Sequence, residues 1–121
     1  MPVYQGPKSC YARKEGVYVR RARRPGIDTL AEAAAIAKLI LRDLRRGYTY
    51  ENRSCKRIKM TKELAVRRLN FLKLLARRHR APRMIVEATD FLVEYVLREW
   101  RLPRGRVSRL ARTMIVRRSR V

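Results

Sequence analysis

The chain has 121 residues, of which 32 are Lys or Arg and 10 are Asp or Glu, and its formal net charge is +22. A compact domain with this charge repels itself, so the composition indicates a polyanionic partner and argues against a domain that works alone. Hydrophobic residues make up 46% of the chain, which excludes a wholly disordered basic tail, and no uninterrupted apolar stretch reaches the length of a membrane span.

Residues 1–27 differ in composition from the rest of the chain. They contain three Pro, three Gly and seven cations against one acid, and they show no helical period. We therefore predict two units, a basic extended arm over 1–27 and a helical bundle with a basic C-terminal segment over 28–121. The cations and two tyrosines of the arm are candidate nucleic-acid contacts: Lys8, Tyr11, Arg13, Lys14, Tyr18, Arg20, Arg21, Arg23 and Arg24.

The first seven residues lack the apolar core of a signal peptide. Pro and Gly among them would also break the amphipathic helix that a transit peptide needs. We therefore expect a cytoplasmic location and no membrane partner.

The first helix is predicted over 28–46. Thr29 and Glu32 have the spacing of a capping box, apolar residues follow at steps of three or four, and Gly47 favours a left-handed cap at the end. We interpret residues 48–60 as a loop, without regular structure, that connects this helix to the next. Its candidate nucleic-acid contacts are Tyr48, Tyr50, Arg53, Lys56, Arg57 and Lys59.

Two further helices are predicted over about 61–80 and about 83–101, separated by a break at Pro82. The earlier one has an apolar face that includes Leu69 and Leu72, and cations cover much of its remaining surface. The later one is apolar around most of its circumference, which is typical of a central bundle helix and leaves a face that a neighbouring protein could contact. The candidate nucleic-acid contacts in this region are Arg67, Arg68, Arg77 and Arg78.

The last segment, 106–121, is predicted as a shorter helix, with a strand over 113–116 as the alternative. The expected fold class is therefore all-α: a small three- to four-helix bundle with an extended basic N-terminal arm and a basic C-terminal tail. The candidate nucleic-acid contacts of the tail are Arg104, Arg106, Arg109, Arg112, Arg117, Arg118 and Arg120.

The charge is distributed unevenly among these segments. The first and third predicted helices hold seven of the ten acids, whereas the arm, the loop, the second helix and the tail hold 25 of the 32 cations. A compositional bias of the genome would spread the surplus more evenly, so four basic segments around a near-neutral scaffold indicate nucleic acid as the polyanion. Arg outnumbers Lys by 25 to 7, and its planar guanidinium matches phosphate oxygens and stacks on bases.

Cys10 and Cys55 are the two cysteines, and His79 is the single histidine. These three ligands have no paired spacing and fall short of the four that a structural zinc site needs, so we expect no metal. We expect two reduced thiols and keep a disulfide as the alternative. The alternative stays open because scarce Asn and Gln are typical of hyperthermophiles, whose intracellular proteins retain disulfides.

No set of residues with the spacing of a catalytic site is evident. The chain has no Gly-rich phosphate loop and no Ser–His–Asp set, and Glu87, Asp90 and Glu94 are interpreted as ion-pair partners of Arg98 and of other arginines. We therefore expect a protein that is not an enzyme and that has no cofactor and no small-molecule substrate.

Contacts from Lys and Arg to phosphate suit RNA and DNA alike. The candidate tyrosines favour structured RNA, because its loops offer splayed bases on which aromatic rings stack, although each ring could instead pack against the edge of the bundle. The alternative is a DNA-binding protein of the chromatin or helix-turn-helix type, in which residues 106–121 would supply the recognition helix.

A compact domain with basic extensions that almost lack acids resembles the small ribosomal proteins, and the Arg bias and scarce amides resemble those of a hyperthermophilic archaeon. This resemblance concerns composition and layout across the whole chain. It implies a structural role, in which the protein neutralises and braces ribosomal RNA beside neighbouring ribosomal proteins, and it implies no catalytic residues.

Overall fold

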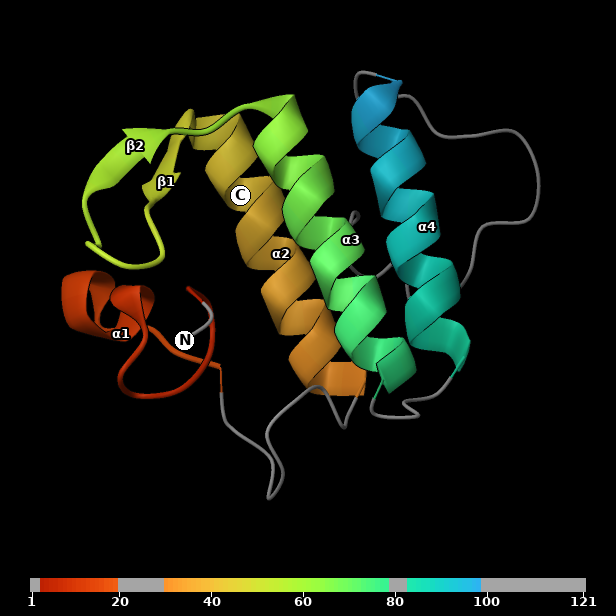
Figure 1. The fold of residues 1–121 in the computed structure, drawn as a ribbon, viewed down its shortest axis with the longest axis horizontal. Helices are drawn as coiled ribbons and strands as arrows, with labels where there is room; N and C mark the ends of the chain where they lie inside the picture. Colours follow the sequence, from red (N-terminus) through yellow and green to blue (C-terminus); the bar gives the residue numbers. More distant parts are fainter. Residues whose placement is uncertain (1–2, 20–29, 79–82, 99–121) are drawn as a thin grey trace, which may run out of the picture.

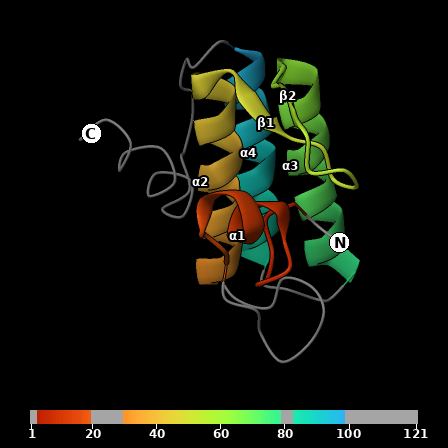
Figure 2. The ribbon, with the colours of Figure 1, turned by 90° about the vertical axis from the view of Figure 1, so that its left-hand side faces the viewer.

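The computed structural model describes residues 3–19, 30–78 and 83–98. Three helices, α2 (Leu30–Arg46), α3 (Lys62–Arg78) and α4 (Arg83–Leu97), form a bundle in which each contacts the other two. A short helix, α1 (Cys10–Glu15), and a hairpin of β1 (Tyr48–Tyr50) and β2 (Arg57–Lys59) lie together on one side of this bundle (Figures 1 and 2).

The three long helices lie where the hydrophobic period predicts them, which confirms that part of the sequence analysis. Their facing residues form one core, in which Ile40, Leu41, Leu69, Ile85 and Leu92 are almost completely buried. The predicted helix over 106–121, its strand alternative over 113–116 and the boundary between 27 and 28 lie outside the described residues. Within the described ranges, no helix combines the length and the apolar character needed to cross a lipid bilayer.

The prediction of an all-α fold is wrong, because the predicted loop over 48–60 contains a two-stranded antiparallel sheet. Tyr48 pairs with Lys59, Thr49 with Ile58 and Tyr50 with Arg57. The chain alternates as strands do, so Thr49 is buried on the inner face while Arg57 and Lys59 are exposed. Each strand has three residues, which is shorter than the run that a period-two pattern needs to be recognised.

The prediction of an extended N-terminal arm is also wrong for the residues that the structure describes. Ser9 caps α1 by accepting a hydrogen bond from the backbone N–H of Ala12 at 3.2 Å, and Gly16 ends the helix in the left-handed conformation at φ 69°. The segment then folds back, and the N–H of Gly6 donates to the carbonyl of Val19 at 3.3 Å. A helix of six residues is too short to show a period in the sequence.

This N-terminal segment belongs to the core. Val3, Tyr4, Cys10, Tyr11 and Val19 are all buried, and they are contiguous with the apolar cluster between the long helices. Apolar residues here are spaced irregularly because they pack from loops and one short turn. The sequence pattern therefore did not reveal them as core residues.

A fully buried carboxylate, that of Asp43 on α2, connects the segment to the bundle. Its Oδ2 accepts hydrogen bonds from the hydroxyls of Tyr4 at 2.9 Å, of Thr49 at 2.8 Å and of Tyr11. Its Oδ1 faces the Arg46 guanidinium at 3.1 Å. These contacts come from the N-terminal segment, α1, α2 and β1, so one carboxylate joins four pieces of the chain.

Three arginines extend this network, two beside the carboxylate and one through the hydroxyls that donate to it. Arg68 of α3 donates to the Tyr4 hydroxyl at 2.8 Å and to Thr49 Oγ1 at 2.6 Å. Arg42 and Arg46 of α2 donate to the two oxygens of Glu15 at 3.0 and 2.8 Å. Partial burial raises the pKa of Glu15, but the hydrogen bond from Arg46 and the charge of Arg42 outweigh it, and the pKa lies below its ordinary value.

Removing either tyrosine hydroxyl from the buried carboxylate should destabilise the fold. We expect Tyr4→Phe and Tyr11→Phe each to lower the free energy of unfolding by about 1.5–3 kcal/mol, the range for a hydrogen bond to a charged group. Tyr18→Phe is the matched control, since this ring is 54% exposed, and its effect should stay within about 0.5 kcal/mol. Urea unfolding measures all three, and equal effects would contradict this account.

The buried phenols also predict a loss of stability at alkaline pH. Burial, and then the negative charge of Asp43, raises the pKa of Tyr4 to about 12, and burial raises the pKa of Tyr11 as well. The folded state therefore holds these protons more tightly than the unfolded state, whose tyrosines titrate near pH 10. Their contribution is complete below about pH 10 and is lost as the pH rises towards about 12.

The measurement is the urea concentration at the midpoint of unfolding, determined between pH 8 and pH 12 together with the absorbance of ionised tyrosine. We expect the midpoint to fall through this window, and the Tyr4→Phe variant to lose less stability across it than the wild type. A midpoint that is independent of pH, or a variant curve parallel to that of the wild type, would argue against the buried phenols.

Candidate nucleic-acid interface

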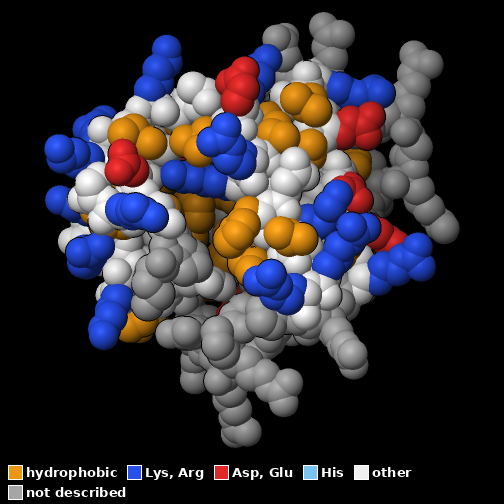
Figure 3. Space-filling view, in the orientation of Figure 1, with side chains coloured by type: hydrophobic (Ala, Val, Ile, Leu, Met, Phe, Trp, Pro, Cys, Tyr) orange, Lys and Arg blue, Asp and Glu red, His pale blue; other side chains and the backbone are white. Residues whose placement is uncertain are grey.

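Exposed cations gather on the side of the molecule that carries α1 and the hairpin. Within 3–19 and 48–59, seven Lys and Arg side chains are exposed, and Glu51 is the exposed acid of these two segments. Figure 3 shows Lys and Arg side chains along this edge, whereas basic and acidic side chains alternate over α4. The seven cations are Lys8, Arg13, Lys14, Arg53, Lys56, Arg57 and Lys59.

The opposite side of the bundle carries balanced charges. Lys73 of α3 pairs with Asp90 at 2.7 Å, Arg83 pairs with Glu87 at 3.4 Å, and Arg98 pairs with Glu94 at 3.1 Å. The pairing of Glu94 with Arg98 follows the interpretation made from the sequence. Because these three cations already have carboxylate partners, they offer a polyanion less than the exposed cations of the α1 side do.

A disulfide between Cys10 and Cys55 joins α1 to the turn between the two strands, with a Cα–Cα distance of 5.4 Å. The expectation of two reduced thiols is therefore wrong, and the alternative is correct. Sequence spacing could not decide between them, because the two cysteines are 45 residues apart and only the folding of the N-terminal segment brings them together. The bridge fixes the two cationic segments to each other.

One tyrosine of the hairpin carries arginine side chains on its ring. The guanidinium of Arg57 lies 3.6 Å from the ring centroid of Tyr48, and that of Arg46 lies 3.9 Å from it. Such cation–π contacts stabilise the arginines in one orientation. Arg46 also pairs with Glu15 and Asp43, so it belongs to the buried network, whereas Arg57 is exposed and stays in the candidate interface.

The structure separates the four candidate tyrosines. Tyr18 is 54% exposed and Tyr11 is fully buried. Tyr48 and Tyr50 are half-buried, and Tyr50 makes edge-to-face contacts with both Tyr48 and Tyr11. Because the Tyr11 ring is buried, a base cannot stack on it, and its hydroxyl belongs to the Asp43 network. We therefore remove Tyr11 from the candidate interface and take Tyr18 as its main stacking candidate.

The candidates on α3 also divide into two groups. Arg67, Arg77 and Arg78 are exposed. Arg68 is partly buried and donates to the Tyr4 hydroxyl, to Thr49 and to the carbonyl of Tyr50 at 2.9 Å, so it supports the fold. We remove Arg68 from the candidate interface as well. The remaining candidates lie outside the described residues: Arg20, Arg21, Arg23, Arg24, Arg104, Arg106, Arg109, Arg112, Arg117, Arg118 and Arg120.

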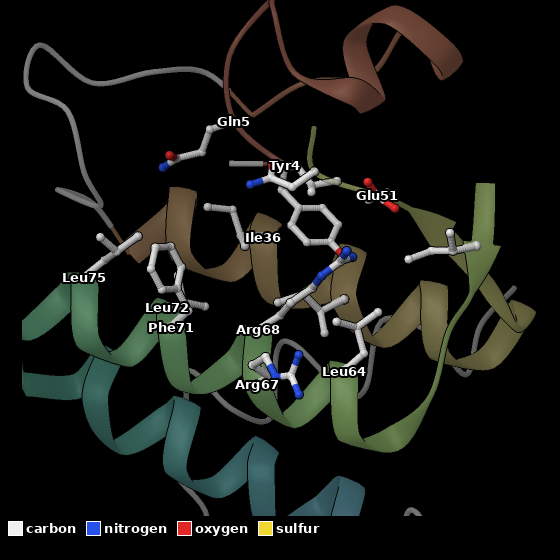
Figure 4. Close-up of a pocket in the computed structure, with 14 residues that line it drawn as sticks. Tyr4, Gln5, Ile36, Glu51, Leu64, Arg67, Arg68, Phe71, Leu72 and Leu75 are labelled. Carbon is white, nitrogen blue, oxygen red and sulfur yellow. The ribbon is translucent and has the colours of Figure 1, made fainter. Parts of the chain in front are cut away.

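An apolar groove of about 400 Å³ opens between the N-terminal segment, α2, α3 and the hairpin (Figure 4). Ile36 of α2, Leu72 and Leu75 of α3 and the ring of Tyr4 form its walls, with Arg67 at one side. Phe71 lies beside it and is 52% exposed. Most of its lining is apolar, although Glu51, Arg67 and Arg68 also line it, so the groove suits an apolar surface better than a phosphate.

Comparisons with protein-family models, with curated proteins and with solved structures found no match.

The disulfide that joins the cationic segments should contribute substantially to stability. The cysteines have a sequence separation of 45, and closing a loop of this length gives about 4 kcal/mol from chain entropy. We expect a measured loss of about 2–4 kcal/mol for Cys10→Ser combined with Cys55→Ser. Wild-type protein unfolded in the presence of a reductant is the control, and it should lose the same amount. A double variant as stable as the oxidised wild type would show that the bridge does not constrain the fold.

Proposed function

We propose that this protein is a structural RNA-binding protein, which neutralises and braces a folded RNA in the manner of a ribosomal protein. The observation that carries the proposal is the concentration of seven exposed cations, with Glu51 as the exposed acid, on 3–19 and 48–59. Affinity for nucleic acid comes mainly from such phosphate neutralisation. Binding rather than catalysis is proposed, because these residues offer charge without an acid–base or nucleophilic pair.

The way in which the cations are presented favours RNA over duplex DNA. They project from a six-residue helix, a hairpin and the turns between them, and neither strand nor helix is long enough there to follow a major groove by itself. Tyr18 adds an exposed ring on the N-terminal segment that carries three of these cations. Aromatic rings next to cations suit the unpaired bases of a folded RNA, whereas the bases of a duplex are stacked.

The disulfide bears on the cellular compartment and the kind of organism that we propose. Stable disulfides are rare in the cytoplasm of mesophiles and occur in intracellular proteins of hyperthermophiles. The chain has one Gln and two Asn among 121 residues, a scarcity that is typical of such proteins. We therefore propose a cytoplasmic ribonucleoprotein component of a thermophilic archaeon.

The test measures the affinity for a labelled RNA hairpin between about 50 and 200 mM salt, with a duplex DNA of the same length as competitor. If roughly 6–10 phosphates are neutralised, the affinity should fall by about 10³–10⁵-fold over this range. Excess duplex DNA should displace the hairpin poorly. If duplex DNA displaces the hairpin effectively, the DNA-binding alternative is favoured instead. An affinity that does not depend on salt would overturn both proposals.

A paired substitution tests the role assigned to the exposed tyrosine. Tyr18→Ala should weaken RNA binding by about 1–3 kcal/mol, the range for one stacked base. Lys73→Gln is the control, since this lysine is paired with Asp90 on the balanced side and should bind nearly as the wild type does. Equal affinity of the two variants would contradict stacking by Tyr18.

A further inference from the structure

The disulfide brings together two similar triplets of the sequence. Residues 8–10 read Lys-Ser-Cys and residues 53–55 read Arg-Ser-Cys, so each cysteine has a serine before it and a cation two residues before it. The bridge holds the two cysteine Cα atoms 5.4 Å apart. The cations of both triplets are therefore close in space although 45 residues separate them along the chain.

Each triplet is held in a turn by its own serine. Ser9 Oγ accepts from the N–H of Ala12 at 3.2 Å, and Ser54 Oγ accepts from the N–H of Lys56 at 3.2 Å. These hydrogen bonds fix the backbone on which the two cations are mounted. Cys55 itself has φ 54°, so the second triplet ends in a left-handed residue that redirects the chain towards β2.

A third cation joins the other two from α1. Arg13 lies one helical turn after Cys10, and its Nη2 donates to Cys55 Sγ at 2.7 Å. The guanidinium is thus held against the bridge itself, between the two triplets. Its remaining donors are available to a ligand, because a guanidinium carries five N–H groups.

These residues line one hollow on the surface, together with Pro7 and Asn52. No acidic side chain lines it, and none of the ion pairs among the described residues involves Lys8, Arg13 or Arg53. Three cations held together without a counter-charge repel one another, and a bound anion relieves that repulsion. The side-chain amide of Asn52 supplies a neutral donor to the same space.

We propose that this hollow is a phosphate-binding clamp, formed by Lys8, Arg13 and Arg53 and held in shape by the Cys10–Cys55 disulfide. In the protein's proposed role, on which this inference rests, the ligand is a phosphate of the RNA backbone. Two forked guanidiniums and an ammonium match the several oxygens of one phosphate or of two adjacent ones. The bridge orders the clamp before the ligand arrives, so less ordering is required on binding.

The test compares two variants with the same loss of charge. The clamp variant combines Lys8→Gln, Arg13→Gln and Arg53→Gln, and the control combines Lys73→Gln, Arg83→Gln and Arg98→Gln on the balanced side. We expect the clamp variant to bind the RNA hairpin at least about tenfold more weakly than the control. The slope of its log affinity against log salt concentration should also be shallower than that of the control by about 2–3. Equal affinities and slopes would overturn the clamp, even if the wild type binds RNA as proposed.

A second measurement uses inorganic phosphate alone, with chloride at equal ionic strength as the reference. The backbone amide resonances of Asn52 and Arg53 should shift with phosphate in the wild type and not in the clamp variant. Shifts that RNA also produces assign the site to the nucleic-acid backbone. Shifts with phosphate that RNA does not produce would overturn the RNA ligand, and the absence of both would overturn the site.

The contribution of the bridge is tested with Cys10→Ser combined with Cys55→Ser. We expect this variant to bind the RNA hairpin more weakly than the control while its circular dichroism remains helical. Binding as tight as that of the wild type would overturn the role of the bridge. If the serine variant does not fold, the two charge variants, which keep the disulfide, still decide whether the clamp exists. A wild type that binds no RNA but shifts with phosphate would refute the proposed function and leave the phosphate site supported.

Discussion

The carboxylate of Asp43 is fully buried, and an ionised carboxylate in that position is costly unless hydrogen bonds and positive charge compensate it. The fold supplies both, because three hydroxyls donate to one of its oxygens and Arg46 faces the other. Removing any one contributor leaves part of a buried charge uncompensated. The N-terminal segment, α1, α2, β1 and, through Arg68, α3 must therefore assemble around this carboxylate together.

The same requirement separates two groups among the described cations around α1 and the hairpin. Arg42, Arg46 and Arg68 serve Asp43, Glu15 and the hydroxyls around them, and they are half-buried. The exposed cations of α1 and of the hairpin lie beyond this inner group. A cation count along the chain cannot make the distinction, because an arginine that compensates a buried carboxylate and one that faces solvent have the same sequence signature.

The long helices could be recognised in the sequence, and the short elements could not. The helices α2, α3 and α4 each extend over four turns or more, so their apolar stripes repeat often enough to be recognised. The helix α1 and the two strands each contain only three to six residues. Their structure depends on tertiary partners, above all Asp43 and the disulfide, and tertiary context overrides local propensity in such short segments.

In the candidate site, too, the sequence could not predict what depends on tertiary partners. Exposure of Lys8, Arg53 and Arg57 agrees with their selection from the sequence, since a cation without a buried partner remains in solvent. The burial of Tyr11 could not be inferred, because its partners lie 32 and 38 residues further along the chain. The two triplets that end in cysteine were visible in the sequence, but their meaning depends on the bridge that joins them.

Two different connections hold the N-terminal segment, and they attach it to different parts of the fold. The Asp43 network is polar and buried, and it fixes Tyr4 and Tyr11 to the bundle. The disulfide is covalent, joins two buried cysteines and fixes α1 to the turn of the hairpin. A network of hydrogen bonds alone would leave the cationic edge free to open, because the charges there repel each other. The covalent bridge opposes that repulsion directly and keeps the cationic segments together in the absence of a counter-charge. For the proposed role this order is an advantage with a folded RNA, because two ordered surfaces lose less conformational freedom when they associate.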